Sequence, residues 1–226
     1  MPHAPAARQL ALALAHSESF APEDFLPGRP NAAAHALVTG WPDWPASVVA
    51  LVGPEGAGKS HLAAIWAEQA GARFLSGRAL RGVNLPGALA TGALVIEDIA
   101  PDSLDETALF HLLNLAREEE AFILLTARTT PAGWNLGLAD LASRLRAVPL
   151  AVLEPPDDAT LRAVMVKLFA DRQLEVDEAL LAYLLSRIER SFTAARDAVT
   201  RLDAEALRRQ RPVTRALAAE LFRPAL

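Results

Sequence analysis

The feature that most limits the fold of this chain is the stretch at residues 53–60, Gly-Pro-Glu-Gly-Ala-Gly-Lys-Ser. It fits the pattern G-x-x-x-x-G-K-[ST], in which a glycine-rich turn presents backbone N–H groups to phosphate oxygens. Lys59 is a compact cation that reaches the β- and γ-phosphates, and the hydroxyl of Ser60 is a suitable ligand for Mg²⁺. The pattern predicts that ADP or ATP binds with Mg²⁺ at Gly53, Pro54, Glu55, Gly56, Ala57, Gly58, Lys59, Ser60 and His61.

The sequence on both sides of this loop agrees with a phosphate site. Residues 47–52 are mostly apolar and predict a short buried strand, whereas residues 61–70 predict a helix that ends at Gly71. The loop therefore precedes a helix N-terminus, where the helix dipole favours an anion. The alternative is a glycine-rich turn that arises by chance, but the strand, the Lys-Ser pair and the helix together favour the phosphate site.

Composition narrows the class of protein. The chain has 226 residues, 52% of them hydrophobic and 22% charged, which suits one α/β domain with a small appendage. Its net charge of −5 does not indicate a nucleic-acid binder. It has no cysteine, and its five histidines lack the spacing of a metal site. Without a run of about 18 apolar residues or a signal peptide, we expect a soluble, cytoplasmic protein with no membrane partner.

A second chemical signal follows an apolar run at residues 93–96, which ends in two carboxylates, Glu97 and Asp98. This order is that of a Walker B strand, whose carboxylates hold Mg²⁺ and orient the attacking water. We expect Glu97 to bind Mg²⁺ together with Ser60, and Glu97 and Asp98 to be catalytic. The alternative is a solvated strand end, which the preceding phosphate loop makes the weaker interpretation.

The segments that surround these motifs alternate between expected strands and helices. Strands are expected at 73–75, 93–98, 121–126 and 148–153, and helices at 103–118, with Ser103 as N-cap, and at 138–145. Such alternation predicts a parallel sheet with helices on both faces. This α/β domain is expected to span residues 19–154.

The strand signal ends at the proline-rich segment 154–157. Four helices are expected after it, at 157–172, 177–188, 192–209 and 214–222, with Asp157 and Asp177 as N-caps of the first two. Residues 155–226 are therefore expected to form a small all-helical domain. The many arginines of this domain either form a solvated face with the acidic residues between them or contact a nucleotide, an acidic partner or DNA. The sequence leaves both interpretations open.

Residues 1–18 are alanine-rich and are expected to form a flexible tail. Alternating leucines in an extended tail fit apolar pockets on a partner, so the expected partner-binding residues are Gln9, Leu10, Leu12 and Leu14. A short helix that packs on its own domain is the alternative, and the pattern alone leaves both open.

Phe25, Gly28 and Asn31 recur at every third position before the loop. Phe25 is an expected contact for an adenine, and Gly28 permits a close approach of the backbone. Asn31 is the expected N-cap of a helix that runs to about residue 38.

Together these features resemble the AAA+ P-loop ATPases, and in particular the branch that contains DnaA and Hda. Residues 9–14 are similar to a sliding-clamp-binding motif, residues 25–31 to a segment beside the adenine, and residues 135–145 to the segment that bears an arginine finger. The resemblance covers nearly the whole chain. It implies an αβα domain followed by a helical lid, and it assigns the finger to Arg144.

The resemblance also implies partners. These are DnaA and the sliding clamp of DNA polymerase III, with DNA contacted only through the clamp and a homo-oligomer left open. The sequence ends before the helix-turn-helix domain that DnaA carries, so we expect an inactivator rather than an initiator.

Three positions depart from the branch. Its Walker B strand usually ends in Asp-Asp rather than Glu97-Asp98, its sensor 1 position falls on Arg128, and its sensor 2 arginine falls near Thr193, between Arg190 and Arg196. These positions serve hydrolysis more than binding, so we expect weak intrinsic ATPase activity with nucleotide binding retained. The expected function is a regulator that stimulates ATP hydrolysis by DnaA. The alternatives are a motor or loader ATPase, and an interaction module that a nucleotide stabilises.

Overall fold

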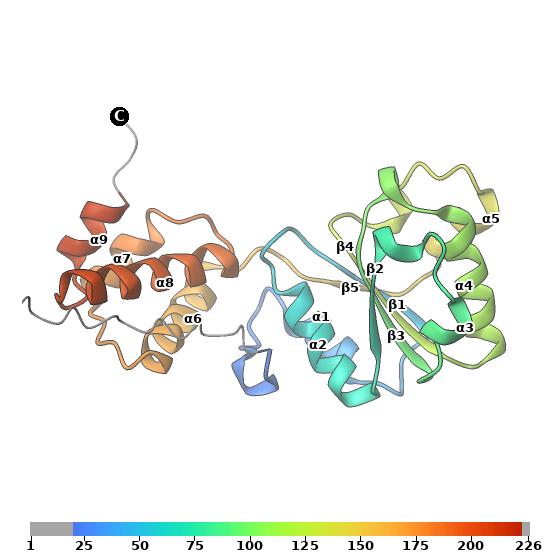
Figure 1. Cartoon of the computed structure of the whole chain (residues 1–226), viewed down its shortest axis with the longest axis horizontal. Coiled ribbons are helices and arrows are strands. Elements are labelled where there is room, and N and C mark those ends of the chain that lie inside the picture. Colours follow the sequence, from blue (N-terminus) through green and yellow to red (C-terminus); the bar gives the residue numbers. More distant parts are fainter. Residues whose placement is uncertain (1–19, 223–226) are drawn as a thin grey trace, which may run out of the picture.

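The computed structural model describes residues 20–222 and contains two parts that lie side by side along its long axis (Figure 1). The first part is an αβα domain, and the second is a bundle of four helices. The expected partner-binding residues of the tail, at positions 9–14, lie outside the described residues.

The αβα domain is built on five parallel strands in the order β2-β3-β4-β1-β5. The strands are β1 (Val48–Val52), β2 (Arg73–Ser76), β3 (Ala93–Ile99), β4 (Phe122–Ala127) and β5 (Leu150–Val152). This confirms the parallel sheet that the sequence predicts. Because all the strands point the same way, their carboxyl ends share one edge, and the loop at residues 53–60 lies at that edge after β1.

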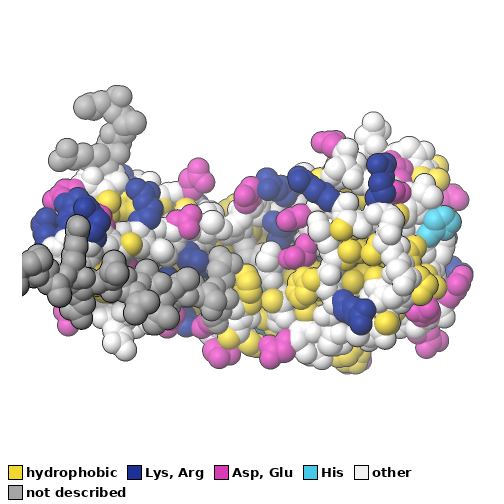
Figure 2. Space-filling model, viewed as in Figure 1, with side chains coloured by type: hydrophobic (Ala, Val, Ile, Leu, Met, Phe, Trp, Pro, Cys, Tyr) yellow, Lys and Arg dark blue, Asp and Glu magenta, His cyan; other side chains and the backbone are white. Residues whose placement is uncertain are grey.

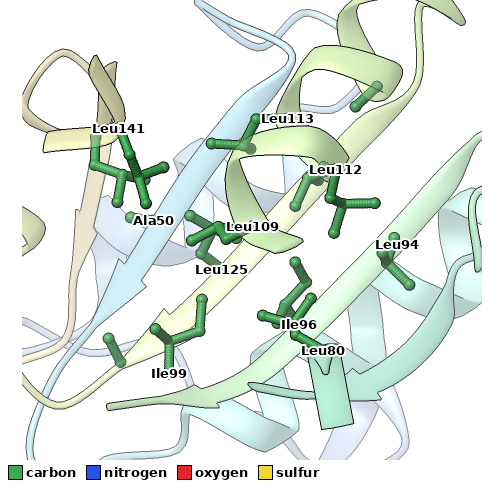
Figure 3. Packing of buried hydrophobic residues seen from close by; sticks show 14 of the residues in the cluster. Ala50, Leu80, Leu94, Ile96, Ile99, Leu109, Leu112, Leu113, Leu125 and Leu141 are labelled. Atoms are coloured by element: carbon green, nitrogen blue, oxygen red, sulfur yellow. The ribbon is translucent and has the colours of Figure 1, made fainter. Parts of the chain in front are cut away.

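Helices cover both faces of the sheet. They are α1 (Ala32–Thr39), α2 (Lys59–Ala70), α3 (Leu85–Ala88), α4 (Glu106–Glu118) and α5 (Ala139–Arg146), with short 3₁₀ turns η1 (Pro22–Asp24), η2 (Gly77–Leu80), η3 (Pro101–Ser103) and η4 (Pro131–Gly133). Strand β1 shows the division: Val49 and Leu51 pack with α1 and α2, whereas Ala50 packs with α4 and α5 (Figure 3). Both faces are therefore apolar, as expected for a strand in the interior of a parallel sheet.

One expected helix cap is wrong, and a second stands at the expected position without a capping hydrogen bond from its side chain. Helix α4 begins at Glu106 rather than near Ser103, because the carboxylate of Asp105 accepts a hydrogen bond from the N–H of Ala108 at 2.9 Å, and Ser103 ends the turn η3. Asn31 precedes α1 but does not cap it. Its side chain points toward the preceding loop instead. There it accepts a hydrogen bond from the N–H of Gly28 at 2.7 Å and donates one to the carbonyl of Leu26.

The helical domain contains α6 (Asp158–Asp171), α7 (Glu178–Leu185), α8 (Phe192–Arg209) and α9 (Arg215–Leu221). The side chains of Asp157 and Asp177 cap α6 and α7, as the sequence predicts. Its core is built around Met165, Phe169 and Leu202, which are completely buried. The domain has a core of its own, so it is more than an extension of the sheet.

The surface carries mixed charge. On the face seen in Figure 2, acidic and basic side chains are interspersed over both domains. Between residues 20 and 222, none of the helices combines the length and the apolar character that crossing a membrane requires.

Candidate nucleotide-binding site

The glycine-rich loop is fixed between β1 and α2. The N–H of Gly53 donates to the carbonyl of Ala127 at 3.2 Å, which ties the loop to the end of β4. A Cβ atom on Gly53 would lie 2.6 Å from the carbonyl oxygen of Leu153, and Gly58 has a φ of +94°. Both positions therefore require glycine, for space in the first case and for backbone conformation in the second. The predicted strand, loop and helix are confirmed.

Lys59 is the cation that the loop pattern predicts to contact phosphates. Its side chain belongs to the first turn of α2, is 8% exposed, and donates from Nζ to the carbonyls of Gly53 and Pro54 at 2.8 Å each. Burial lowers the pKa of Lys59, an effect that the nearby carboxylate of Asp98 opposes. A desolvated ammonium held by two neutral oxygens interacts strongly with an anion that replaces them. The loop and Lys59 therefore fit a phosphate group.

The two carboxylates that the Walker B pattern predicts, Glu97 and Asp98, lie at the same edge of the sheet as the loop. Glu97 keeps the regular register of β3, opposite Ser76 of β2. Asp98 lies in a β-bulge with a φ of +52°, and its N–H donates to the hydroxyl of Thr126 on β4 at 3.0 Å. A left-handed aspartate is uncommon, and the bulge re-aims this carboxylate relative to the rest of the strand. Asp98 is close enough to Lys59 to influence its pKa.

The expected Mg²⁺ ligands are consistent with a metal that arrives with a nucleotide. Ser60 is exposed on the first turn of α2, and Glu97 is half-buried at the sheet edge. Within residues 20–222, no group of three or more His, Cys, Asp or Glu side chains could hold a metal ion by itself. Mg²⁺ commonly takes one or two carboxylates and completes its shell with water and phosphate oxygens. One hydroxyl and one carboxylate therefore fit this role.

A cavity of about 490 Å³ lies beside the loop, between the two domains. Its walls include Phe25, His61, Phe192 and Arg196. The rings of Phe25 and Phe192 also flank Gly58, within 3.9 Å of where its Cβ would lie. The cavity has the volume of a small-molecule site, and its aromatic walls suit a planar base.

Phe25 and His61, both expected near the nucleotide, lie together. The ring of Phe25 stacks on His35 with centroids 5.2 Å apart and contacts the ring of His61 edge-on at 5.4 Å. Nε2 of His61 lies 3.0 Å from the carbonyl of Ala21. Burial lowers the pKa of His61. Gly28, by contrast, faces the helical domain: a Cβ there would lie 2.9 Å from Oγ1 of Thr160.

The helical domain reaches the loop through the start of α8. The N–H of Phe192 donates to the carbonyl of Gly56 at 2.8 Å, and a Cβ on Gly56 would lie 2.7 Å from Cβ of Ser191. Of the two arginines expected near the sensor 2 position, Arg196 lines the cavity. Arg190 instead forms an ion pair with Asp158 at 3.1 Å within the helical domain.

The remaining arginines of the helical domain mostly contact their own neighbours. Carboxylates of the same domain pair with Arg162, Arg172, Arg208, Arg209 and Arg211. Two others, Arg187 and Arg215, lie over the ring of Tyr183 at 5.4 and 5.9 Å. The interpretation as a solvated face with internal ion pairs accounts for these arginines, although Arg172 also lines the cavity together with Arg196.

Arg144 is far from this site. It is exposed on α5, on the side of the αβα domain away from the helical domain, whereas the loop contacts that domain (Figure 1). Its guanidinium lies 4.7 Å from the ring centroid of Phe110, and Nη1 donates to Oδ1 of Asn114 at 2.5 Å. Within the described part of the chain, Arg144 forms no ion pair with Asp140, which lies one turn before it on the same helix.

Helix α5 is itself firmly held. Leu141 and Leu145 are buried in the core, and the carboxylate of Glu106 accepts hydrogen bonds from the N–H groups of Gly137 and Leu138 at 3.0 and 2.7 Å. An anion at this position also suits the helix N-terminus. The helix therefore presents Arg144 from a fixed base.

Sequence reasoning missed three parts of this arrangement. It did not identify Phe110 and Asn114 as the partners of Arg144, nor the ion pair between Arg128 and Glu55 at 2.8 Å. The spacing of Phe110 and Asn114 at i and i+4 on α4 places them on one face, which is a signal that a search could use. The contact between Arg128 and Glu55 has no local signal, because it depends on the order of the strands.

Comparison with known proteins shows which solved structures share this fold. No protein-family model matches the chain. Among solved structures, domain III of the replication initiation protein DnaA from Thermotoga maritima is similar with a TM-score of 0.78 and 20% identity, over 91% of this chain and 98% of that chain.

Two longer chains are also similar. AMPPCP-bound DnaA from Aquifex aeolicus has a TM-score of 0.69 and 18% identity, over 83% of this chain and 68% of its own length. The Holliday junction branch migration motor RuvB from Thermotoga maritima has a TM-score of 0.63 and 21% identity, over 84% of this chain and 64% of its own length. At these identities the likeness concerns the fold. This chain has the fold of DnaA domain III, an αβα domain followed by a helical domain.

Proposed function

We propose that this chain is a nucleotide-binding regulator of the Hda type, which stimulates ATP hydrolysis by DnaA and so acts as a negative regulator of DNA replication initiation. One observation carries the proposal: Arg144 is exposed, supported by neutral partners, and lies on the side of its domain away from its own phosphate loop. The fold, which is that of DnaA domain III, supports an assembly of like domains.

The phosphate loop would bind ADP or ATP in this regulator. Lys59 would exchange its two carbonyl partners for the β- and γ-phosphates, and the cavity lined by Phe25 and Phe192 would receive the base. Ser60 and Glu97 would hold Mg²⁺, which would neutralise charge on the phosphates. Binding at the junction of two domains would fix their orientation, so the nucleotide would set the shape in which the chain meets its partners.

Arg144 would act on ATP held by the partner. Negative charge on the γ-phosphate oxygens must be stabilised during phosphoryl transfer, and a guanidinium supplied from a neighbouring subunit does so. Arginine suits the role because it is permanently charged and presents a planar set of donors. Phe110 and Asn114 orient this group without neutralising it, because neither carries a charge.

The tail would dock on the sliding clamp through Gln9, Leu10, Leu12 and Leu14. Replacing Gln9, Leu12 and Leu14 with alanine should abolish capture by immobilised clamp and leave nucleotide binding unchanged. Normal capture of the triple variant would exclude the tail as the docking segment.

The test of the whole proposal is hydrolysis of DnaA-bound ATP with clamp, DNA and this protein present, and with each omitted in turn. The expected result is fast hydrolysis with all components and a loss of stimulation whenever one is left out. Equal hydrolysis with and without this protein would overturn the regulatory role.

A second candidate is a motor or loader ATPase. It is favoured by the presence of Lys59, Glu97 and Asp98 at one sheet edge, which is a nearly complete hydrolytic site in cis. Turnover by the purified protein alone separates the two: rapid turnover that does not require DnaA supports the motor, and slow turnover supports the regulator.

A further inference from the structure

The start of α5 is capped by a residue of another helix. Its N-cap residue, Leu138, has an apolar side chain, which cannot accept a hydrogen bond. In a capping box the third residue of the helix accepts the N–H of the N-cap, but in α5 this residue is Leu141, which is buried in the core. Glu106, the first residue of α4, instead accepts the N–H of Leu138 at 2.7 Å and that of Gly137 at 3.0 Å.

The same face of α4 also contacts Arg144. Glu106, Phe110 and Asn114 follow one another at intervals of four residues, and all three are half-buried. Residues with this spacing lie along one face of a helix. The first of them contacts the start of α5, whereas the other two contact the guanidinium of Arg144 near its end. One face of α4 therefore holds α5 at both ends.

Glu106 restricts movements of α5 that its apolar contacts permit. Leu141 and Leu145 fix the depth of the helix in the core, but apolar contacts have no preferred direction, so they restrict its rotation and its position along its axis less. Hydrogen bonds depend on direction, and the two oxygens of this carboxylate accept two N–H groups at once. The carboxylate therefore sets how α5 lies against α4.

We propose that Glu106 is a positioning residue for Arg144: its carboxylate fixes α5 against α4, and so fixes where the guanidinium lies. The inference rests on the finger role of Arg144 in the proposed function and adds a residue that acts through the helix. Arg144 follows Leu138 by six positions, which is about 9 Å along a helix. Because so short a helix moves as a unit, a displacement at its start is carried to the finger.

The experiment measures hydrolysis of DnaA-bound ATP, with clamp and DNA present, at increasing amounts of this protein. It separates the rate at saturation from the amount of protein that gives half of that rate. Glu106→Ala should lower the saturating rate about 10- to 100-fold, because a displacement of about 1 Å costs up to about 10² in rate. The half-saturating amount should stay close to the wild-type value. An unchanged saturating rate, with or without a change in the half-saturating amount, would overturn the inference.

Glu106→Gln removes one of the two hydrogen bonds. An amide has a single acceptor oxygen, so only one of the N–H groups of residues 137 and 138 keeps its partner, and the negative charge that suits a helix start is lost. The saturating rate should lie between those of the wild type and Glu106→Ala. Glutamine keeps the size of the side chain, so this variant carries the test if the alanine variant does not fold. A wild-type rate would show that the carboxylate is not required, against the inference.

Amide hydrogen exchange on the chain alone gives a readout that does not involve DnaA. In Glu106→Ala the amides of residues 137–142 should exchange faster than in the wild type, while those of the helical domain keep their rates. Unchanged exchange in this segment would mean that Glu106 does not hold the start of α5, and the inference would fall. Failure of the wild type to stimulate DnaA would instead overturn the proposed function, and the exchange rates would still test the hold of Glu106 on α5.

Asp177→Ala is the matched control. The carboxylate of Asp177 accepts the N–H of Leu180 at 2.7 Å and caps α7 in the helical domain, so this variant loses a helix cap of the same kind. It should lose thermal stability as Glu106→Ala does, but it should keep the full saturating rate. An equal loss of rate in Asp177→Ala would show that lower stability, rather than displacement of Arg144, reduces the stimulation.

Discussion

Two cations of the αβα domain, Lys59 and Arg144, differ in a way that separates their roles. Both are held by neutral partners, two carbonyls for Lys59 and an amide oxygen with an aromatic ring for Arg144. Lys59 is 8% exposed at the start of α2, whereas Arg144 is exposed on the side away from the helical domain. Neutral partners leave the charge of each side chain available for a ligand. Under the proposed function, the buried Lys59 would bind the chain's own nucleotide and the exposed Arg144 would contact the nucleotide of a partner.

The residue types agree with this division. A buried ammonium on a flexible stem can change partners when a phosphate enters, and its desolvation strengthens the new contact. A guanidinium keeps its charge in any environment and projects a fixed set of donors. Exchanging the two residues would therefore impair both sites.

The largest effect is expected from Arg144→Ala. Removing a finger that acts on a partner should lower the stimulation of DnaA hydrolysis by roughly 10³-fold or more, because such groups are worth about 10³–10⁵ in rate. Nucleotide affinity, clamp capture and thermal stability of the variant should stay at wild-type values. The measurement is the rate of hydrolysis of DnaA-bound ATP with increasing amounts of variant.

Arg146→Ala is the matched control for this substitution, because Arg146 is exposed on the same short helix. It should keep full stimulation. Full stimulation by Arg144→Ala would exclude the finger, and loss of folding would show that its contacts with Phe110 and Asn114 serve stability.

Lys59→Ala should give the next largest effect, and this effect should concern binding of nucleotide to the chain itself. Loss of a charge-assisted phosphate contact should weaken binding of ADP and ATP by about 1.5–3 kcal/mol. Titration calorimetry on the purified chain measures this directly. Unchanged affinity for both nucleotides would show that the loop is not the phosphate site, whatever Arg144 does.

Asn114→Asp sharpens the comparison by giving Arg144 a charged partner. The new carboxylate should hold the guanidinium in an ion pair on its own subunit, and stimulation of DnaA should fall about 5-fold, the strength of a good exposed pair. Asn114→Ser, which keeps a neutral acceptor, should have a smaller effect. Equal loss in both variants would mean that the charge of the partner is irrelevant, against the argument that neutral support matters.

The sequence was sufficient for most of the fold. Apolar runs of strand length, the loop pattern and the cap residues Asp157 and Asp177 are local signals, and they predicted the sheet and all four helices of the second domain. The cap at Ser103 was wrong because Asp105, two residues closer to the helical pattern, caps the helix instead. Asn31 stands at the expected N-cap position of α1, but its side chain accepts a hydrogen bond from the preceding loop rather than from the helix.

The contacts of the candidate site were harder to predict from the sequence than the fold. The loop motif identifies Lys59, but the contact of Arg128 with Glu55 and that of Arg144 with Asn114 join segments far apart in the chain. Such contacts depend on strand order and helix packing, which a single sequence does not specify at the level of side chains. The bulge at Asp98 was not predicted either, because nothing in its residue type requires a left-handed backbone.

The smallest expected effect concerns His61, where burial disfavours the charged form of the side chain. Its ring is packed between Phe20 and Phe25, and Nε2 contacts the carbonyl of Ala21 at 3.0 Å. Burial is the main cause that lowers its pKa below the ordinary 6.5, and the charge of Arg196 adds to it. The folded chain therefore takes up a proton on this residue at lower pH than the unfolded chain does.

The linkage between this pKa and folding has a definite sign. Between the lowered pKa of folded His61 and 6.5, the unfolded chain binds more protons, so the free energy of unfolding should decrease as pH falls through that window and stay constant above it. His61→Phe keeps a ring against Phe25 but cannot titrate, so denaturant melts of this variant should lose part of the decrease between pH 7.5 and 5.5. If the variant and the wild type lose stability in parallel over this range, the environment of His61 does not disfavour its charge.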